Sequence, residues 1–267
     1  MNGLSKLQHA GAHQDHDSRT CRASPNHIQA WQPARVRIRE NDSLIYLDSR
    51  SNIRHMENQS ATIRRRGRPP KRLDEQSDTR EMLLRAGVEI LTMKGFCATG
   101  LDEMLRSVGV PKGSFYHYFD SKEAFGAELI VRYGAYFARK LQRHLGDESQ
   151  SPLERLRAFV ADAQSGMAKY GYTRGCLIGN LGQEMGALPA SYGDRLSAVF
   201  ADWQERVAHC LLAAQAAGEI SQEIDCEQHA AFFWIGWEGA VLRAKLERQP
   251  TALVIFSDVF FAGLKSR

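Results

Sequence analysis

The chain has 267 residues, of which 43% are hydrophobic and 25% are charged, and its net charge is +4. This length and apolar content are enough for one or two packed domains with sizeable cores. No run approaches the roughly 18 apolar residues of a membrane helix, the start lacks the apolar core of a signal peptide, and the five cysteines show no CxxC or paired spacing. We therefore expect a cytoplasmic protein with reduced thiols, and we predict no metal and no cofactor.

Residues 1–60 are polar, rich in Asn, Asp, Ser, His and Gln, and show no helical period. Such a composition buries too little apolar surface to fold, so this extension is predicted to be disordered. A start of translation at Met56 is an equal alternative, and no function is assigned to the extension.

A basic arm, residues 61–77, follows the extension. It holds six cations and no acid between Arg64 and Arg72, and removing these six from the net charge of +4 leaves −2 on the other residues. Pro69 and Pro70 exclude a helix and favour an extended backbone. An extended Arg-Gly-Arg-Pro segment suits the narrow minor groove of AT-rich DNA, and a solvated tail is the alternative. The predicted minor-groove contacts are Arg64, Arg65, Arg66 and Arg68.

A first helix is predicted from about residue 79 to residue 94, where Gly95 ends it. Beyond it, two short helical patterns meet at Gly109, which can adopt a positive φ and turn the chain. Pro111 suits the first position of the second helix. Two helices joined by a tight glycine turn form the helix-turn-helix layout, whose second helix enters the major groove of DNA. The earlier pattern has one buried face with apolar residues three and four apart, namely Leu101, Met104, Leu105 and Val108.

The second of these helices, predicted over residues 111–118, is short, aromatic and basic. Phe115, Tyr118 and Phe119 are expected to anchor it in a small core. Its first basic residue is the main candidate for reading a guanine edge, and the lysine that begins the following helix is placed to bind a phosphate together with that helix's amides. The predicted DNA contacts of this segment are Lys112, Gly113, Ser114, Tyr116, His117 and Lys122.

A fourth helix is predicted to begin after Asp120 and Ser121, both good N-caps, and to run to about Leu145, which would carry it from the DNA-binding domain into the next domain. From Ser151 onward the helical period dominates, and we find no convincing alternating strand pattern. The architecture is therefore predicted to be all-α. The remaining helices are predicted over residues 151–170, 175–186, 190–217, 225–248 and 250–265.

The run PKGSFYHYFDSKEAF, preceded by LDEMLRSVGV, resembles the DNA-binding domain of TetR-family transcriptional regulators, from Thr79 to Phe125. The resemblance implies an N-terminal three-helix helix-turn-helix domain over residues 78–125. It also implies a C-terminal helical domain for ligand binding and dimerisation over residues 126–267. A protein of this kind would be a repressor that binds a palindromic DNA operator as a homodimer.

The predicted dimer interface is a four-helix bundle made from two C-terminal helices of each subunit. Gly236, Gly239 and Ala240 would let backbones approach closely, with apolar side chains around them and along the last helix. A dimer on a palindrome would place its two reading helices about one helical turn of DNA apart.

The segment YGYTRGCLIGNLGQEMGALP, residues 170–189, contains five glycines, which a helix tolerates only at a cost. Together with WIGWEGAVLRAKLE it resembles acrylate-responsive and, more loosely, electrophile-responsive repressors of the same family. This resemblance implies release from DNA by acrylate or a related small unsaturated compound. A small carboxylate needs a cation in an apolar pocket, for which Arg174 is the first candidate and Arg243 the second. The residues predicted to bind the inducer are Tyr170, Arg174, Cys176, Asn180, Gln183, Trp234 and Trp237.

Cys176 leaves two mechanisms open. Its place in the GCL motif matches the cysteine of the electrophile-responsive repressors, and a thiolate favoured by Arg174 would add to an activated alkene. A small buried residue beside a reversibly bound ligand is the alternative.

Two other classes of protein were weighed against the repressor. A thiol-dependent enzyme that pairs Cys176 with His209 or His229 lacks a nucleophile motif, so no catalysis is predicted. An architectural DNA binder would bind through the arm without sequence preference. Activation instead of repression also stays open.

Overall fold

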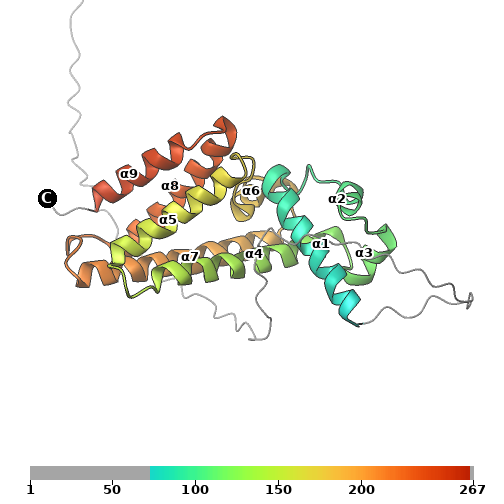
Figure 1. Ribbon diagram of the computed structural model, residues 1–267, viewed down its shortest axis with the longest axis horizontal. Coiled ribbons are helices and arrows are strands. Elements are labelled where there is room, and N and C mark those ends of the chain that lie inside the picture. The colour runs from blue at the N-terminus through green and yellow to red at the C-terminus, as the bar shows by residue number, and fades with distance from the viewer. Residues whose placement is uncertain (1–72, 265–267) are drawn as a thin grey trace, which may run out of the picture. The chain divides into compact units, whose positions relative to one another are not determined.

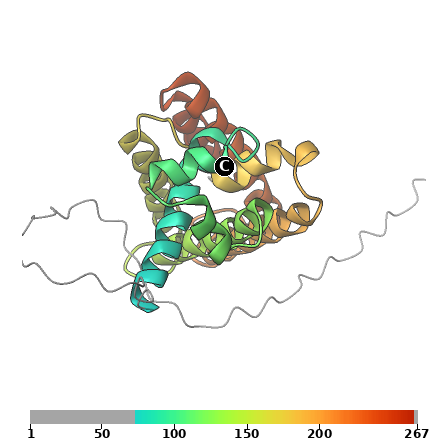
Figure 2. The same ribbon diagram turned by 90° about the vertical axis from the view of Figure 1, so that its right-hand side faces the viewer.

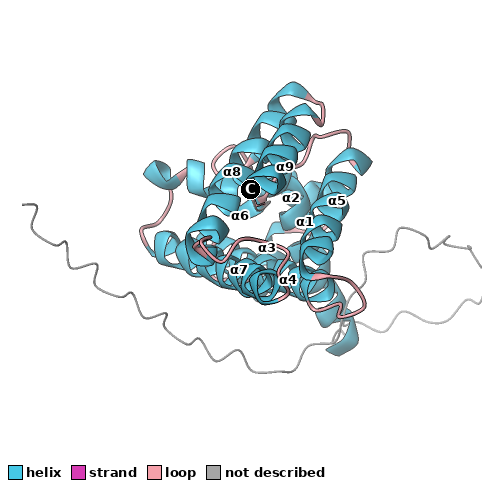
Figure 3. Ribbon diagram, turned by 90° about the vertical axis from the view of Figure 1, so that its left-hand side faces the viewer, coloured by secondary structure: helices cyan, strands magenta, loops and turns pink. Residues whose placement is uncertain are grey.

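The computed structural model describes residues 73–264, and every regular element in that range is helical (Figures 1 and 3). The predicted all-α architecture is confirmed. The predicted extension and the four arginines of the arm lie outside the described residues. Within residues 73–264, no helix is long and apolar enough to cross a membrane. The elements are α1 (Leu73–Lys94), α2 (Leu101–Ser107), α3 (Lys112–Tyr118), α4 (Lys122–Leu145), α5 (Pro152–Lys169), α6 (Leu177–Gln183), the 3₁₀ turn η1 (Met185–Ala187), α7 (Ser191–Ala216), α8 (Cys226–Glu247) and α9 (Thr251–Gly263).

Helix boundaries differ from the predicted ones by more than two residues at two places. α1 begins at Leu73, inside the predicted arm and six residues before the predicted start at residue 79. α6 ends at Gln183 and a separate 3₁₀ turn follows, where one helix to residue 186 was predicted. Gly182 and Gly186 weaken a continuous helix there, and Glu184 between them bonds to the connection between α1 and α2 instead.

The core of the C-terminal helices is built around Trp203 of α7, which is fully buried. Its ring centroid lies 4.5 Å from that of Phe137 on α4 and 5.0 Å from that of Trp234 on α8. α7 packs on α4, α5 and α8, and α8 also packs on α9. Burying an aromatic side chain of this kind contributes about 2–3 kcal/mol, so this cluster fixes the packing of α4, α7 and α8.

A second aromatic cluster joins α3 to α4. Phe115, Phe119 and Phe125 are all buried, and their ring centroids lie 4.8–5.3 Å apart. The predicted anchoring of the reading helix by Phe115 and Phe119 is confirmed, and Tyr118 packs on the same core while partly buried. α4 begins in this cluster and continues along α7, so both groups of helices share it (Figure 1).

Gly109 forms the turn between α2 and α3 with a φ of +65°. The Val110 amide donates to the carbonyl of Leu105 at 3.0 Å, and the Gly109 amide donates to the carbonyl of Arg106 at 3.3 Å. A left-handed residue with two such bonds is a common helix ending, and here it supplies partners for two of the last carbonyls of α2. The predicted glycine turn is confirmed, and it leads α2 directly into α3.

Gly134 of α4 faces Val199 of α7, where a methyl group on Gly134 would lie 2.8 Å from Val199 Cγ2. We predict that Gly134→Ala lowers the free energy of unfolding by about 1–3 kcal/mol, because overpacking outweighs the gain in helix propensity. Adding Val199→Ala should restore much of this loss, although Val199→Ala alone leaves a void. Urea unfolding of all four proteins gives the coupling free energy.

The control for this cycle is Gly166→Ala on α5, where no atom lies within 4 Å of the added methyl group. This variant should be as stable as the parent protein or more stable. An equal loss for Gly134→Ala with and without Val199 would contradict the packing of α4 on α7.

Candidate DNA interface and ligand site

α3 is held by one side and leaves its other side in solvent, on the face of the molecule turned to the viewer in Figure 2. Phe115 points into the core, whereas the Tyr116 side chain is 51% exposed. No atom lies within 4 Å of the place that a Cβ on Gly113 would take, so a DNA backbone can approach closely there. Four of the six residues predicted to touch DNA on this segment share the open face: Lys112, Gly113, Tyr116 and His117.

Lys112 begins α3 and pairs with Asp102 of α2, with a nitrogen–oxygen distance of 3.2 Å. Both side chains are more than half exposed, so the ion pair contributes little to stability. The ammonium group can therefore exchange this carboxylate for a phosphate or a guanine edge at small cost.

The other two predicted DNA contacts of this segment lie differently. Ser114 is only partly exposed. The Lys122 ammonium donates to the carbonyl of Phe96 at 2.9 Å and lies 4.3 Å from the centre of the Phe96 ring. Lys122 thus ties α4 to the connection between α1 and α2, and we leave it out of the proposed DNA contacts.

A carboxylate beyond the end of α6 holds the connection between α1 and α2. Glu184 accepts hydrogen bonds from the amide of Phe96 at 3.0 and 3.1 Å and from the amide of Cys97 at 2.7 Å. Gly95 has a φ of +84° and brings the backbone so near that any Cβ there would collide with this carboxylate. The same carboxylate raises the pKa of the exposed Cys97 thiol. Hydrogen bonds to a charged acceptor contribute about 1.5–3 kcal/mol each.

α6 also holds the last turn of α1. The side-chain amide of Asn180 donates to the carbonyls of Leu91 and Thr92 at 2.9 and 3.0 Å. The Gly175 amide, just before α6, donates to the Thr92 carbonyl at 3.0 Å. Carbonyls in the last turn of a helix need partners from outside it, and here α6 provides them. We call these contacts, together with those of Glu184, the α6 latch.

The seven residues predicted to bind the inducer do not form one site. The guanidinium of Arg174 pairs with Glu89 of α1 and lies 3.9 Å from the ring centre of Tyr170. Arg243, the second candidate cation, pairs with Glu247 one turn along α8. Both cations expected to hold an inducer carboxylate therefore already have a carboxylate partner in the protein.

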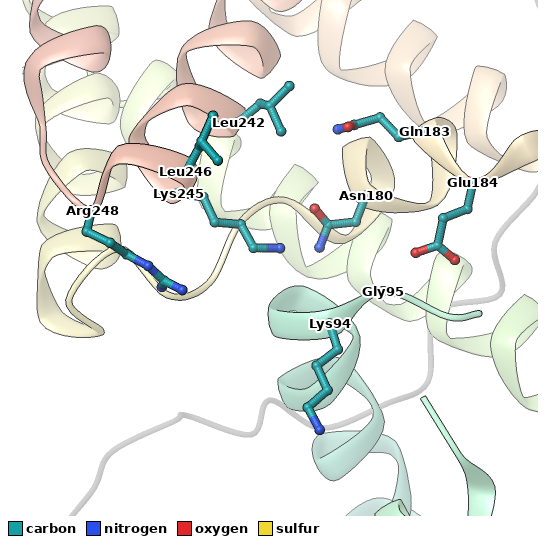
Figure 4. A pocket seen from close by; sticks show the side chains of 9 residues that line it. All are labelled: Lys94, Gly95, Asn180, Gln183, Glu184, Leu242, Lys245, Leu246 and Arg248. Carbon is teal, nitrogen blue, oxygen red and sulfur yellow. The ribbon is translucent and has the colours of Figure 1, made fainter. Parts of the chain in front are cut away.

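The other five predicted ligand residues lie in two further places. Asn180 and Gln183 line an open groove beside α8 (Figure 4). Cys176, Trp234 and Trp237 are buried among the C-terminal helices. The indole N–H of Trp234 is buried and has no hydrogen-bond partner among the described residues. A buried donor without a partner is uncommon.

Sequence reasoning missed a group of weak acids beside Cys176. The Cys176 thiol, the Glu238 carboxyl and the Tyr133 hydroxyl interact with one another among the C-terminal helices. Gly179 of α6 makes room for them, because a Cβ there would collide with the Glu238 carboxyl. The signal available in the sequence is a single acid within the apolar run AFFWIGWEGAV.

Burial sets the protonation of this group. It raises the pKa of the Glu238 carboxyl to about 7. Burial and then the Glu238 charge raise the pKa of the Cys176 thiol well above its ordinary value, although the amides of Gly179 and Ile178 lower it. An Arg174 near the thiol would favour a thiolate, but its guanidinium forms an ion pair with Glu89. Burial thus favours the protonated thiol of Cys176, in line with the alternative of a small buried residue beside a reversibly bound ligand.

Characterised proteins resemble this chain over both groups of helices. The family described as "Bacterial regulatory proteins, tetR family" matches residues 83–129, and "Tetracyclin repressor-like, C-terminal domain" matches residues 152–260. The chain is 51% identical to the transcriptional regulator AcuR of Cereibacter sphaeroides over 73% of its own length and 89% of that protein. It is 34% identical to the HTH-type transcriptional repressor NemR of Escherichia coli K12 over 65% of its own length and 87% of that protein. A crystal structure of regulatory protein TetR from Rhodobacter sphaeroides superposes with a TM-score of 0.67 and 52% identity, covering 68% of this chain and 96% of that one.

The raised pKa of Glu238 makes stability depend on pH. Between pH 4.5, the ordinary pKa of this carboxyl, and about pH 7, Glu238 holds its proton more tightly in the folded chain than in the unfolded chain. Its stabilising contribution is therefore complete below 4.5 and is lost as the pH rises through 7. We predict that Glu238→Gln gains stability relative to the parent protein by up to about 3 kcal/mol between pH 5 and pH 8. Urea unfolding at both pH values measures this difference.

Glu205→Gln on the exposed side of α7 is the matched control, and its stability should follow the parent protein at both pH values. Parallel pH profiles for Glu238→Gln and the parent protein would contradict the assigned burial of Glu238.

Proposed function

Because the chain belongs to the TetR family of transcriptional regulators, we propose that it represses transcription as a cytoplasmic homodimer and leaves a palindromic operator when acrylate or a related small unsaturated acid binds. Residues 78–125 are assigned to DNA binding and residues 126–267 to dimerisation and inducer binding. The observation that carries the proposal is the open face of α3, which Phe115 and Phe119 anchor from behind.

The open face of α3 offers groups of the kinds that read and grip DNA. Lys112 is assigned to a guanine edge, Tyr116 to a base or phosphate, and His117 to a phosphate. Gly113 admits the DNA backbone, and Ser114 supplies a small donor at the margin of the face. The arm would add minor-groove contacts that raise affinity for many sequences, through Arg64, Arg65, Arg66 and Arg68.

An apolar surface on α8 and α9 supports the homodimer. Ile235 of α8 is 74% exposed and Val259 of α9 is 64% exposed, although both side chains are large and apolar. Packing α8 and α9 against the same helices of a second copy would form a four-helix bundle and remove this surface from water. The exposed apolar residues of this surface are Phe232, Ile235, Val254, Ile255 and Val259. Leu242 and Leu246 are also exposed but line the open groove beside α6.

The acrylate assignment rests on the resemblance of residues 170–189 and 234–247 to acrylate-responsive repressors. Reversible binding is favoured over covalent addition, because burial keeps Cys176 protonated. A thiol-dependent enzyme is disfavoured, since His229 Nδ1 bonds to the carbonyl of Asp225 in its own helix and His209 is exposed.

The α6 latch supplies a route from inducer to DNA. α6 begins at the buried Cys176 cluster and ends at Glu184, which holds the amides before α2. A ligand that shifts α6 would therefore displace the junction of α1 and α2, and α3 with it. A coupling free energy of 1–3 kcal/mol corresponds to about a 5- to 150-fold change in operator affinity.

Replacing Lys112 tests the reading helix. On a duplex selected by the protein from a random DNA pool, Lys112→Ala should weaken binding by about 1–3 kcal/mol and relax the preference at one base pair of each half-site. Fluorescence anisotropy at fixed salt measures both effects. Lys169→Ala removes the same charge from the exposed end of α5 and should bind as the parent protein does. Equal binding by Lys112→Ala would overturn the assignment of α3 as the reader.

Replacing Cys176 separates reversible from covalent induction. Acrylate should release Cys176→Ser and the parent protein from the selected duplex to the same extent, because a protonated thiol adds slowly to an alkene. Peptide mass spectrometry of the acrylate-treated parent protein should show no adduct on Cys176. An adduct there, together with a Cys176→Ser protein that acrylate no longer releases, would establish covalent sensing instead.

A further inference from the structure

An open groove of about 410 Å³ lies where α1, α6 and the end of α8 meet (Figure 4). We propose that this groove binds a small monocarboxylate, with Lys245 and Arg248 of the α8 end as the cations that hold its charge. The inference deepens the proposed function, on which it rests for the inducer's effect on DNA, by naming a seat for an acidic inducer. The predicted cations Arg174 and Arg243 cannot provide that seat because each is paired with a carboxylate.

Lys245 and Arg248 form a pair of like charges three residues apart, with no ion pair to a carboxylate among residues 78–264. Burial and then the neighbouring Arg248 lower the pKa of the Lys245 ammonium, and the Glu184 charge opposes part of this lowering. The helix dipole stabilises cations near a helix C-terminus. That effect does not explain why the Lys245 ammonium is half-buried beside a guanidinium. An anion between them would offset both the burial and the repulsion.

Arg248 is also held in an unusual backbone conformation. It caps α8 with φ of 56° and ψ of 37°, in the left-handed region that Gly or Asn normally fills. Its guanidinium donates to the carbonyl of Tyr172 at 3.2 Å, and Tyr172 is the other non-glycine residue with positive φ within the described range. Two strained residues bonded to each other at the rim of one groove point to a functional constraint on the position of the guanidinium.

The remaining lining fits the two ends of a short-chain acid. In Figure 4 the Lys245 ammonium points toward Asn180, whose amide N–H groups are held by the carbonyls of Leu91 and Thr92. The exposed Gln183 also lines the groove. Leu242 and Leu246 of α8 are 44% and 76% exposed and offer an apolar wall to a hydrocarbon tail. A site with two cations, the Gln183 amide and an apolar wall beside them suits a small carboxylate.

The other charged groups of the groove are already engaged. Lys94 points away from the groove in Figure 4 and pairs with Glu103. The Glu184 carboxylate is spent on the amides of Phe96 and Cys97. An anion would therefore meet two cations without an ion-pair partner among residues 78–264, beside the α6 latch. Its binding would differ between arrangements in which the latch is closed and open.

Direct binding of propionate tests the site. Propionate has the charge and size of acrylate but no alkene, so it cannot modify a cysteine. Isothermal titration calorimetry at constant chloride should show that Lys245→Gln and Arg248→Asn each weaken propionate binding about tenfold or more. Arg248→Asn suits the positive φ of this position, so a loss of binding by a variant that unfolds no more readily than the parent cannot be blamed on folding.

Lys169→Gln and Arg243→Gln remove exposed cations outside the groove and should bind propionate as the parent protein does. Unchanged binding by both Lys245→Gln and Arg248→Asn would overturn the proposal. Inorganic phosphate that binds the parent protein as tightly as propionate would overturn the choice of a monocarboxylate. Normal propionate binding by Lys245→Gln, even with altered dimerisation, would also overturn the site.

The experiment separates this site from the proposed repressor. Operator release by acrylate, with propionate bound normally by both groove variants, would overturn the groove and leave the repressor standing. Propionate binding that depends on Lys245 and Arg248, with an operator complex that acrylate leaves intact, would support the groove and overturn the proposed inducer.

Discussion

The amides of Phe96 and Cys97 lie in the connection that leads into α2 and α3. Their hydrogen-bond partner is Glu184, which lies nearly ninety residues later in the chain. The last carbonyls of α1 are likewise satisfied by Asn180 of α6. The junction between α1 and α2 is therefore completed by a short helix of the C-terminal group. Because buried or half-buried backbone groups need partners, α1–α3 cannot take a different position relative to α6 without losing these bonds.

Three features gather around α6 as a result. At its start, Cys176 lies in a group of weak acids whose protonation is set by burial. Along its side lies the groove in which Lys245 has no carboxylate partner among the described residues. At its end, Glu184 reaches the backbone next to Gly95. α6 is only seven residues long and glycine-rich, so its own helical bonds resist displacement weakly. A modest ligand energy acting there is suited to change the fit of α3 to DNA.

The sequence predicted what local chemistry decides. Gly109 and Pro111 mark the turn into the reading helix, and the aromatic residues at 115 and 119 anchor it. The contacts between residues far apart in the sequence could not be predicted from it. The residues from 170 to 183 are neighbours in sequence but lie in different places. Arg174 pairs with Glu89 of α1, Cys176 is buried, and Asn180 and Gln183 line the groove. No periodicity predicts that a lone acid in an apolar helix, Glu238, will lie against a glycine of α6.

The coupling carried by the α6 latch can be measured directly as the ratio of operator affinities without and with saturating acrylate. Glu184→Gln replaces the carboxylate that accepts from both amides but keeps the size of the side chain, and Glu205→Gln makes the same change on the exposed side of α7 as a control. This account predicts that the ratio falls toward one in Glu184→Gln and stays at the parent value in Glu205→Gln. A Glu184→Gln protein that acrylate releases from DNA as fully as the parent would contradict it.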